Sequence, residues 1–147
     1  CLTKPIYSSI TNSGDEVRIA ADQIISTNQK DTALIKSAIL RIFSNSGSNI
    51  FLTSDMALIN KGEKSLTLSK NVVLKTSEKI EITAPKMSIS LDKTLIQADG
   101  PVIGFFKTSK IEAGKLDIFK ENNSANLVIS FTKGAKMVYD INRSFLE

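Results

Sequence analysis

The sequence predicts an all-β domain built from about four copies of one two-strand unit, with a sheet that curves into a trough. Three observations lead to this fold class. Short motifs recur at intervals of about 30 residues along the chain. Within each copy, apolar residues alternate with polar ones, which is the period of a strand rather than of a helix. That alternation slips by one residue at the same place in every copy.

Each copy of the repeat carries two marks. The first marks are the strings Ile19–Asp22, Leu52–Asp55, Ile82–Pro85 and Ile111–Gly114. The second marks are the residues that begin the next apolar runs, namely Leu34, Leu66, Leu95 and Leu127. Both series keep a spacing of about 30 residues, so we interpret each copy as two consecutive strands. We see no linker, and we expect residues 1–147 to form a single domain.

The slip in alternation is clearest in the third copy. Ile80, Ile82 and Ala84 share one parity, and Met87 and Ile89 continue on the other. The residues at the four slips are Asp22-Gln23, Asp55-Met56, Pro85-Lys86 and Gly114-Lys115. Asp, Pro and Gly fit poorly in a regular ladder, and an extra residue at such a point is typical of a β-bulge. Bulges at equivalent places would bend the whole sheet along one line.

One stretch, residues 31–42, permits two interpretations. Leu34, Ala38 and Ile42 are four residues apart, as on one face of an amphipathic helix. The position within the repeat and the even-numbered apolar set, which also includes Leu40, favour a strand. We therefore expect a strand here.

The composition offers few side chains that could act in catalysis. The chain has no His, and its one cysteine, Cys1, has no partner for a Cys–His nucleophile. Asp22 and Asp55 occupy equivalent positions, but Pro85 and Gly114 fill the same place without a carboxylate. We expect no enzyme activity, no metal site and no cofactor. Lys and Arg total 19 against 15 acidic residues, a net charge of +4, and no basic run or Trp indicates a nucleic-acid surface.

What remains is a set of apolar residues that share a parity along their strands. One group is Leu66, Leu68, Val72 and Leu74, and another is Leu127, Ile129, Phe131, Met137 and Tyr139. In a closed sandwich these side chains would form an ordinary core. In an open trough they would line a groove for an acyl chain. Parity alone leaves both alternatives open.

Four segments of the chain resemble the LptC family of periplasmic lipopolysaccharide-transport proteins, whose bridge protein LptA shares the repeat. They are Lys4–Tyr7 with Gly14–Asp22, then Leu66–Leu74, then Ile82–Pro85 with Gly100–Gly104, and finally Ile111–Leu116. Leu66–Leu74 is similar to the family pattern L-x-L-x-G-x-V-x-L, except that Lys70 stands in the place of Gly. Gly114 is also slightly out of register in the last segment.

The resemblance implies a twisted β jelly roll that is open along one side. It implies that the protein accepts lipopolysaccharide from an inner-membrane ABC transporter and passes it to an LptA-like bridge protein. The family's membrane helix has no counterpart in this sequence, so we expect the anchor to precede residue 1, with the domain in the periplasm. The alternatives are a soluble LptA-like bridge protein and a purely structural periplasmic scaffold.

On this interpretation we expect two kinds of site. The lipid groove is expected at Leu68, Leu74, Ile82, Ile103, Phe105, Ile111, Ile129 and Phe131. Edges for partner proteins are expected at Val17 and Ile19, facing the transporter, and at Met137, Tyr139 and Ile141, facing the bridge protein. An edge strand offers unpaired backbone groups, to which a partner can add a strand.

Overall fold

A computed structural model of the chain describes residues 4–12, 14–44, 47–106, 109–120, 127–134 and 137–140. Their strands are β1 Lys4–Ile10, β2 Glu16–Ala21, β3 Gln23–Ser26, β4 Thr32–Phe43, β5 Asn49–Asn60, β6 Ser65–Thr76, β7 Ile80–Ser90, β8 Leu95–Phe106, β9 Ser109–Lys120, β10 Leu127–Thr132 and β11 Met137–Asp140. No helix occurs in these ranges, and hence none that is long and apolar enough to cross a membrane. The predicted all-β class is confirmed.

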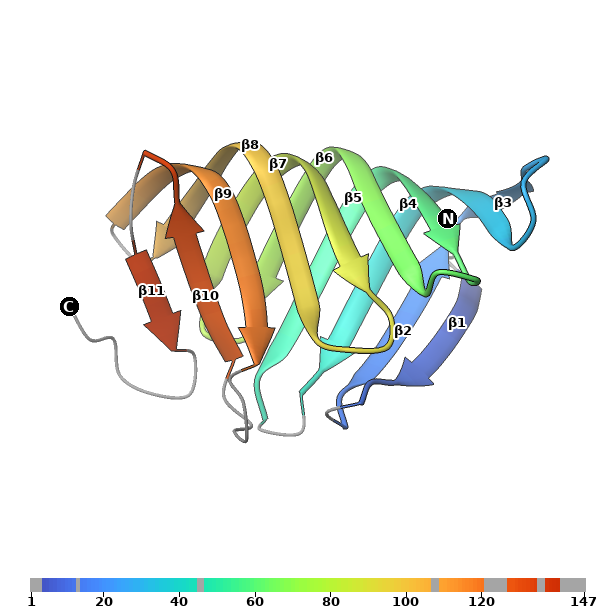
Figure 1. Cartoon of the computed structure of the whole chain (residues 1–147), viewed down its shortest axis with the longest axis horizontal. Helices are drawn as coiled ribbons and strands as arrows, with labels where there is room; N and C mark the ends of the chain where they lie inside the picture. Colours follow the sequence, from blue (N-terminus) through green and yellow to red (C-terminus); the bar gives the residue numbers. More distant parts are fainter. Residues whose placement is uncertain are drawn as a thin grey trace.

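All eleven strands belong to one antiparallel sheet, in the order β1-β2-β4-β5-β6-β7-β8-β9-β10-β11, with β3 paired to the first part of β4. Consecutive strands are neighbours almost throughout, as expected for a stack of two-strand units. The sheet does not close on itself. Figure 1 shows the long strands β4 to β9 arching over the top of the molecule and descending on its two sides. This is the open, jelly-roll-like architecture that the sequence predicted.

The arch follows a line of irregularities that crosses the sheet. β2 stops at Asp22 and continues as β3, and the register shifts between Thr53 and Met56 and between Thr83 and Met87. These are the slips that the sequence marked, and they bend each strand as a bulge does. Asn71 donates a hydrogen bond from Nδ2 to Oδ2 of Asp55 at 2.7 Å. Asp55 therefore stabilises the bend.

The intervening strands also bend on this line, at places the sequence analysis missed. Ser37 in β4 has a φ of 55°, Lys70 and Asn71 in β6 have φ values of 66° and 57°, and Gly100 in β8 has a φ of 90°. These are left-handed conformations, which Gly adopts without strain and other residues adopt at a cost. Ser, Lys and Asn are not strong bulge signals, so periodicity alone did not locate these points.

The bend line divides the sheet into two halves. The β1 half contains β1, β2 and residues 38–43, 49–54, 72–76, 80–84, 102–106 and 109–113. The β11 half contains β3, residues 32–36, 56–60, 65–69, 87–90, 95–99 and 115–120, and strands β10 and β11. Their inward faces pack against each other and form one hydrophobic core.

Cross-strand register explains the repeat. One row of directly paired residues crosses the β1 half: Tyr7, Ile19, Leu40, Leu52, Leu74, Ile82, Gly104 and Ile111. The first marks of all four copies, Ile19, Leu52, Ile82 and Ile111, lie in this single row. The repeat is therefore a structural one, in which each copy adds two strands and one inward residue from each to the same row.

Residues 32–43 form strand β4, so the strand interpretation is confirmed and the helix is wrong. One detail of that interpretation needs correction. Leu34 does not share a face with Ala38, Leu40 and Ile42, because the bend at Ser37 switches the parity and turns Ile35 inward instead. Ile35 is fully buried, whereas Leu34 is half-buried on the outer face.

Candidate functional site

The candidate site is the interior between the two half-sheets. Six of the eight residues predicted to line a groove lie on its walls. Leu74, Ile82 and Ile111 come from the β1 half, and Leu68, Ile129 and Phe131 come from the β11 half. All are fully buried except Ile111, which is half-buried and packs against the core. The sequence thus located both walls of the interior.

The other two predicted lining residues, Ile103 and Phe105, do not face the interior. The bulge at Gly100 and Pro101 sets the parity of β8 so that Val102 and Gly104 point inward. Ile103 and Phe105 therefore lie on the outer face of the β1 half, where the side chain of Phe105 is 42% exposed. The error arose because the bulge on β8 was not recognised, and a bulge exchanges the two faces of a strand.

The predicted amino-terminal edge is wrong. Val17 and Ile19 lie on β2, which pairs with β1 on one side and β4 on the other. Both side chains point inward and are 1% exposed. The outermost strand at this end of the sheet is β1, Lys4–Ile10, which begins with the Lys4–Tyr7 segment and forms a strand of its own.

At the other end, Met137 and Tyr139 lie on β11, the last strand of the described sheet. In the register they pair with Phe131 and Ile129 of β10. Ile141 lies outside the described residues. The backbone position of β11 at the end of the strand order is consistent with the expected edge.

The interior is filled by the protein's own side chains. Seven large side chains on the two walls are fully buried, namely those of Leu40, Leu52, Leu66, Leu68, Leu74, Ile82 and Met87. Side chains that are packed this closely leave no room for an acyl chain while the two halves are together. The structure therefore combines the two alternatives that the sequence left open: the trough has an open sheet, but its walls pack as a core.

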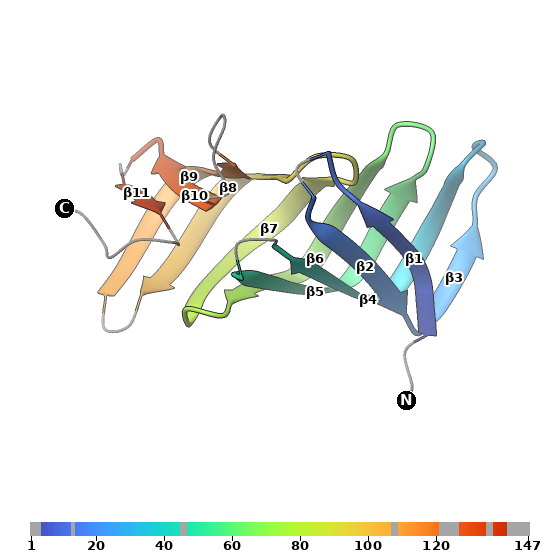
Figure 2. The same cartoon turned by 90° about the horizontal axis from the view of Figure 1, so that it is seen from below.

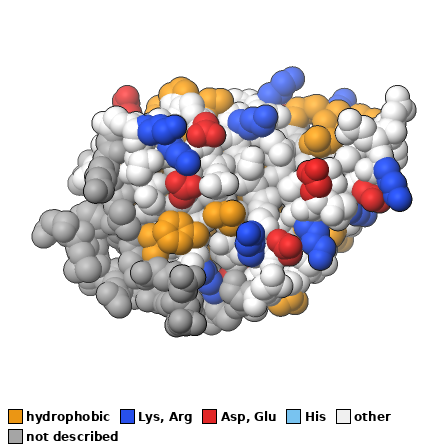
Figure 3. All heavy atoms as spheres, in the orientation of Figure 1, with side chains coloured by type: hydrophobic (Ala, Val, Ile, Leu, Met, Phe, Trp, Pro, Cys, Tyr) orange, Lys and Arg blue, Asp and Glu red, His pale blue; other side chains and the backbone are white. Residues whose placement is uncertain are grey.

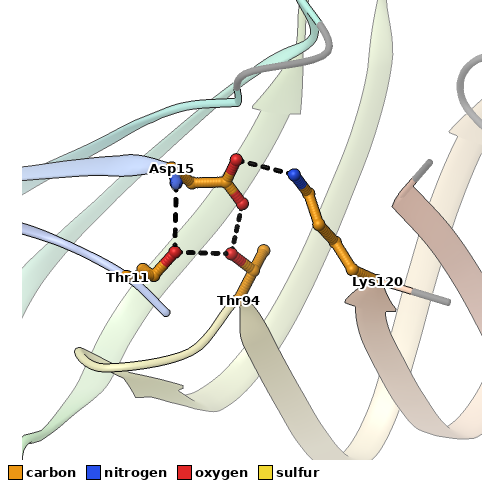
Figure 4. Close-up of polar contacts among 4 residues, drawn as sticks. All are labelled: Thr11, Asp15, Thr94 and Lys120. Atoms are coloured by element: carbon orange, nitrogen blue, oxygen red, sulfur yellow. Dashed lines mark hydrogen bonds and ion pairs between the residues drawn. The ribbon is translucent and has the colours of Figure 1, made fainter. Parts of the chain in front are cut away.

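A cluster of polar residues that the sequence analysis did not single out as a site ties the two halves together. We call Thr11, Asp15, Thr94 and Lys120 the clasp. The Nζ of Lys120 lies 2.7 Å from Oδ1 of Asp15, and the hydroxyl of Thr94 donates to Oδ2 of the same carboxylate. The Oγ1 atoms of Thr11 and Thr94 are 3.3 Å apart, and the amide of Asp15 donates to Oγ1 of Thr11 at 3.1 Å. Figure 4 shows these contacts.

The clasp joins segments that are far apart in the sequence. Thr11 and Asp15 belong to the turn between β1 and β2, Thr94 to the turn between β7 and β8, and Lys120 to the end of β9. Figure 2 shows the β1–β2 hairpin with its tip beside the β7–β8 turn. Sequence separations of 79 and 105 residues leave no local pattern from which the cluster could be recognised.

The charges of the clasp are buried. The side chain of Asp15 is 0% exposed and that of Lys120 is 7% exposed. A buried carboxylate is tolerated only where a counter-charge and hydrogen bonds replace water, and the clasp supplies both. Two backbone carbonyls add to the closure, because Ser9 Oγ donates to the oxygen of Leu91 at 3.2 Å and the amide of Asn12 donates to that of Asp92 at 2.8 Å.

Towards the β11 end, an apolar contact joins the two halves. Phe131 of β10 packs edge-on against Phe106 of β8, with ring centroids 5.6 Å apart. Gly104 makes this approach possible, because a Cβ at that position would lie 2.9 Å from Cζ of Phe131. The seam between the halves is therefore polar at the β1–β2 hairpin and apolar at β10.

The outer surface offers a different chemistry. Arg18 lies over the ring of Phe43, and Arg41 lies over the ring of Phe51, at 5.2 and 5.0 Å. In the face shown in Figure 3, charges of both signs are scattered and the hydrophobic groups are small and separate. A shallow polar hollow is lined by Lys86, Ser88, Gln97, Ala98, Asp99 and Lys115. Neither feature resembles an acyl-chain site, which needs a continuous apolar wall.

Comparison with known proteins agrees with the geometry. The model of the family described as "Lipopolysaccharide-assembly, LptC-related" matches residues 4–134. The match extends from β1 to the turn after β10, and thus includes all four clasp residues and both half-sheets except strand β11. No curated protein matches the chain significantly.

Proposed function

The chain belongs to the LptC family of lipopolysaccharide-transport proteins, and from this premise we propose that it carries lipopolysaccharide by sheltering the acyl chains between its two half-sheets. The observation that carries the proposal is the pair of facing apolar walls. Rows of Leu and Ile cross both halves, and the halves are joined covalently only along the bend line. An acyl chain placed between the walls would exchange water for the same side chains that now pack on each other.

The energetics favour such an exchange. Burying one methylene is worth about 0.8 kcal/mol, so a few methylenes of each chain outweigh the thermal energy many times. Separating the walls exposes residues such as Leu68 and Ile82, and an acyl chain covers them again. Loading therefore replaces one apolar contact by another, which permits both binding and release. Transport of this kind needs no bond to be made or broken.

Partner proteins would join at the outermost strands. β1 pairs only with β2, and β11 pairs only with β10, in the part of the chain that the structure describes. We propose that the inner-membrane transporter joins at the β1 end, and that the LptA-like bridge protein joins at Met137 and Tyr139 of β11. Strand addition at both ends would align the interiors of successive proteins into one apolar path. The family is in general periplasmic and anchored to the inner membrane, and this placement suits such a path.

The filled interior also favours a second candidate, a structural scaffold that binds proteins and no lipid. The two candidates differ in what the purified chain retains. We would incubate it with lipopolysaccharide, and separately with the same lipopolysaccharide stripped of its acyl chains by alkaline hydrolysis, and separate bound from free material by gel filtration. The proposal predicts that the acylated form co-elutes with the protein and the deacylated form does not. Equal retention of both forms, or of neither, would contradict it.

A further inference from the structure

We propose that the clasp is the gate of the interior: acyl chains are admitted when the β1–β2 hairpin releases Thr94 and Lys120 and the two halves part. This inference rests on the proposed function, because it concerns how lipid reaches the interior. It assigns a role to Thr11, Asp15, Thr94 and Lys120, which line no apolar wall.

The two halves have to separate before an acyl chain can enter. The side chains on both walls are buried and closely packed, so an acyl chain has no room between them in the closed form. Along the bend line the halves are continuous through β4 to β9, whose ladders hold them together. Separation is therefore possible only on the opposite side, where the tips of the strands meet.

The β1–β2 hairpin spans this opposite side. Its turn belongs to the β1 half, and it reaches the backbone of Leu91 and Asp92 and the side chains of Thr94 and Lys120 in the β11 half. The hydrogen bonds and the ion pair at this hairpin thus connect tips that no strand pairing joins. Releasing them frees the seam without breaking a ladder.

The hairpin can move together with the rest of the β1 half. β1 pairs only with β2 among the described strands, and β2 pairs with β4 over Glu16–Ala20. β2 ends at Ala21 and β3 begins at Gln23, so the two strands lie on either side of the bend line, with the amide of Asp22 between them donating to the carbonyl of Lys36 at 3.2 Å. A rotation about the bend line would carry the hairpin away from Thr94 and Lys120 together with the β1 half, while β2 stays paired with β4. Hinges of this kind are a few residues at the ends of elements.

The contacts of the clasp are polar and charged. Charged groups regain hydration when they separate into water, whereas apolar side chains lose burial. A polar clasp can therefore close the seam firmly and still release at less cost than an apolar seam of the same extent. The clasp lies at one end of the seam, at the β1–β2 hairpin, and the apolar contact of Phe131 with Phe106 lies at the other end. The seam therefore opens at the β1–β2 hairpin.

A reversible disulfide across the clasp tests the gate. The hydroxyls of Thr11 and Thr94 are 3.3 Å apart, so thiols at these positions lie close enough to be oxidised. We would make T11C/T94C in a Cys1→Ser background, confirm the disulfide by mass, and measure capture of fluorescent lipopolysaccharide with and without a reductant. The matched control is S88C/Q97C, a directly paired position on the outer face of the β11 half, which places a disulfide within one half.

The gate predicts that oxidised T11C/T94C captures lipopolysaccharide at least about tenfold more slowly than its reduced form, and that oxidation of S88C/Q97C changes nothing. Equal capture by oxidised and reduced T11C/T94C overturns the gate while the proposed function stands, provided that both bind. If the reduced protein and the unmodified chain capture no lipopolysaccharide, the proposed function fails and the gate fails with it.

A second variant tests the same gate without a cross-link. Asp15→Asn keeps the shape of the side chain but removes the charge that holds Lys120. The gate predicts faster capture by this variant than by the unmodified chain, at a temperature where circular dichroism shows both to be folded. Slower or unchanged capture by folded Asp15→Asn overturns the assignment. Glu16→Gln, which removes a more exposed charge next to it, is the control and is expected to capture at the unmodified rate.

Discussion

Lys120 and Asp15 form an ion pair with a separation of 2.7 Å between Nζ and Oδ1, although they are 105 positions apart in the sequence. The pair connects the first hairpin of the sheet to the end of β9, across the seam between the two halves. Both side chains are removed from water. Such a pair contributes little net stability compared with a well-packed apolar pair, but the loss of one partner leaves the other charge buried and unpaired.

This asymmetry gives a prediction for stability. Asp15→Ala is expected to lower the free energy of unfolding by about 3 kcal/mol, because it removes the buried carboxylate that pairs with the ammonium of Lys120. The double variant Asp15→Ala/Lys120→Met removes the buried ammonium as well and is expected to regain part of that loss. Urea denaturation followed by circular dichroism measures both. A loss below about 0.5 kcal/mol for the single variant would show that the charge is solvated.

The bend in β6 predicts a stabilising substitution. Lys70 has a φ of 66°, which a side chain with a Cβ adopts at a cost of about 1 kcal/mol. Lys70→Gly removes this cost and is expected to raise the free energy of unfolding by up to about 1 kcal/mol. Lys75→Gly, in a regular part of the same strand, is the control and is expected to destabilise by about 0.5 to 1 kcal/mol. If both variants destabilised the protein equally, Lys70 would not have the left-handed conformation.

The same position explains a departure from the family pattern. The L-x-L-x-G-x-V-x-L motif has Gly where this chain has Lys70, and the structure places a positive φ there. The Gly of the family pattern is thus a backbone requirement of the bend, which this chain meets with a strained Lys and a neighbouring Asn71.

Gly104 predicts the effect of overpacking. A methyl group there would lie 2.9 Å from Cζ of Phe131, 3.1 Å from Cε1 of Phe106 and 3.1 Å from Cγ2 of Ile111. Gly104→Ala is therefore expected to lower the free energy of unfolding by about 1 to 3 kcal/mol. Combining it with Phe131→Leu, which shortens the side chain on the opposite half, is expected to cost less than the sum of the two single losses. Additive losses in this double-mutant cycle would contradict the contact.

The β11 edge predicts a change in partner binding. Tyr139→Asp places a charge on the last described strand, and if an LptA-like protein adds a strand there, its Kd is expected to rise about tenfold or more. Ser88→Asp, on the exposed outer face of β7, is the control and is expected to leave the Kd unchanged. Surface plasmon resonance with the immobilised bridge protein measures both. Unchanged binding by Tyr139→Asp would show that the bridge protein does not bind at β11.

Sequence patterns located what depends on local periodicity. The repeat placed Ile19, Leu52, Ile82 and Ile111 in one row of the β1 half, and the slips placed the bend at Asp22 and its equivalents. Odd or even position no longer tells which face a side chain is on once the strand has passed an unrecognised bulge, because one extra residue exchanges the two faces. Leu34 and Phe105 were misassigned for this reason.

Two other features depend on tertiary structure. The clasp consists of common polar residues that come together only when the sheet folds over, so no spacing in the sequence marks it. The expected edge at Ile19 is wrong because another strand precedes it in the sheet. The less regular segment before it forms β1, with a register shift between Pro5 and Tyr7, and covers that edge.

Whether acyl chains lie between the two half-sheets can be tested by comparing positions on the inner face of the sheet with positions on its outer face. A photo-cross-linking amino acid would be placed at Leu68, Leu74, Ile82, Ile111, Ile129 or Phe131 on the inner walls, and at Ile103 or Phe105 on the outer face. After illumination with lipopolysaccharide, mass spectrometry of the folded variants would detect adducts. If acyl chains lie between the half-sheets, adducts form at the inner positions and none form at Ile103 or Phe105. Adducts confined to the outer face, or none at any inner position, would contradict it.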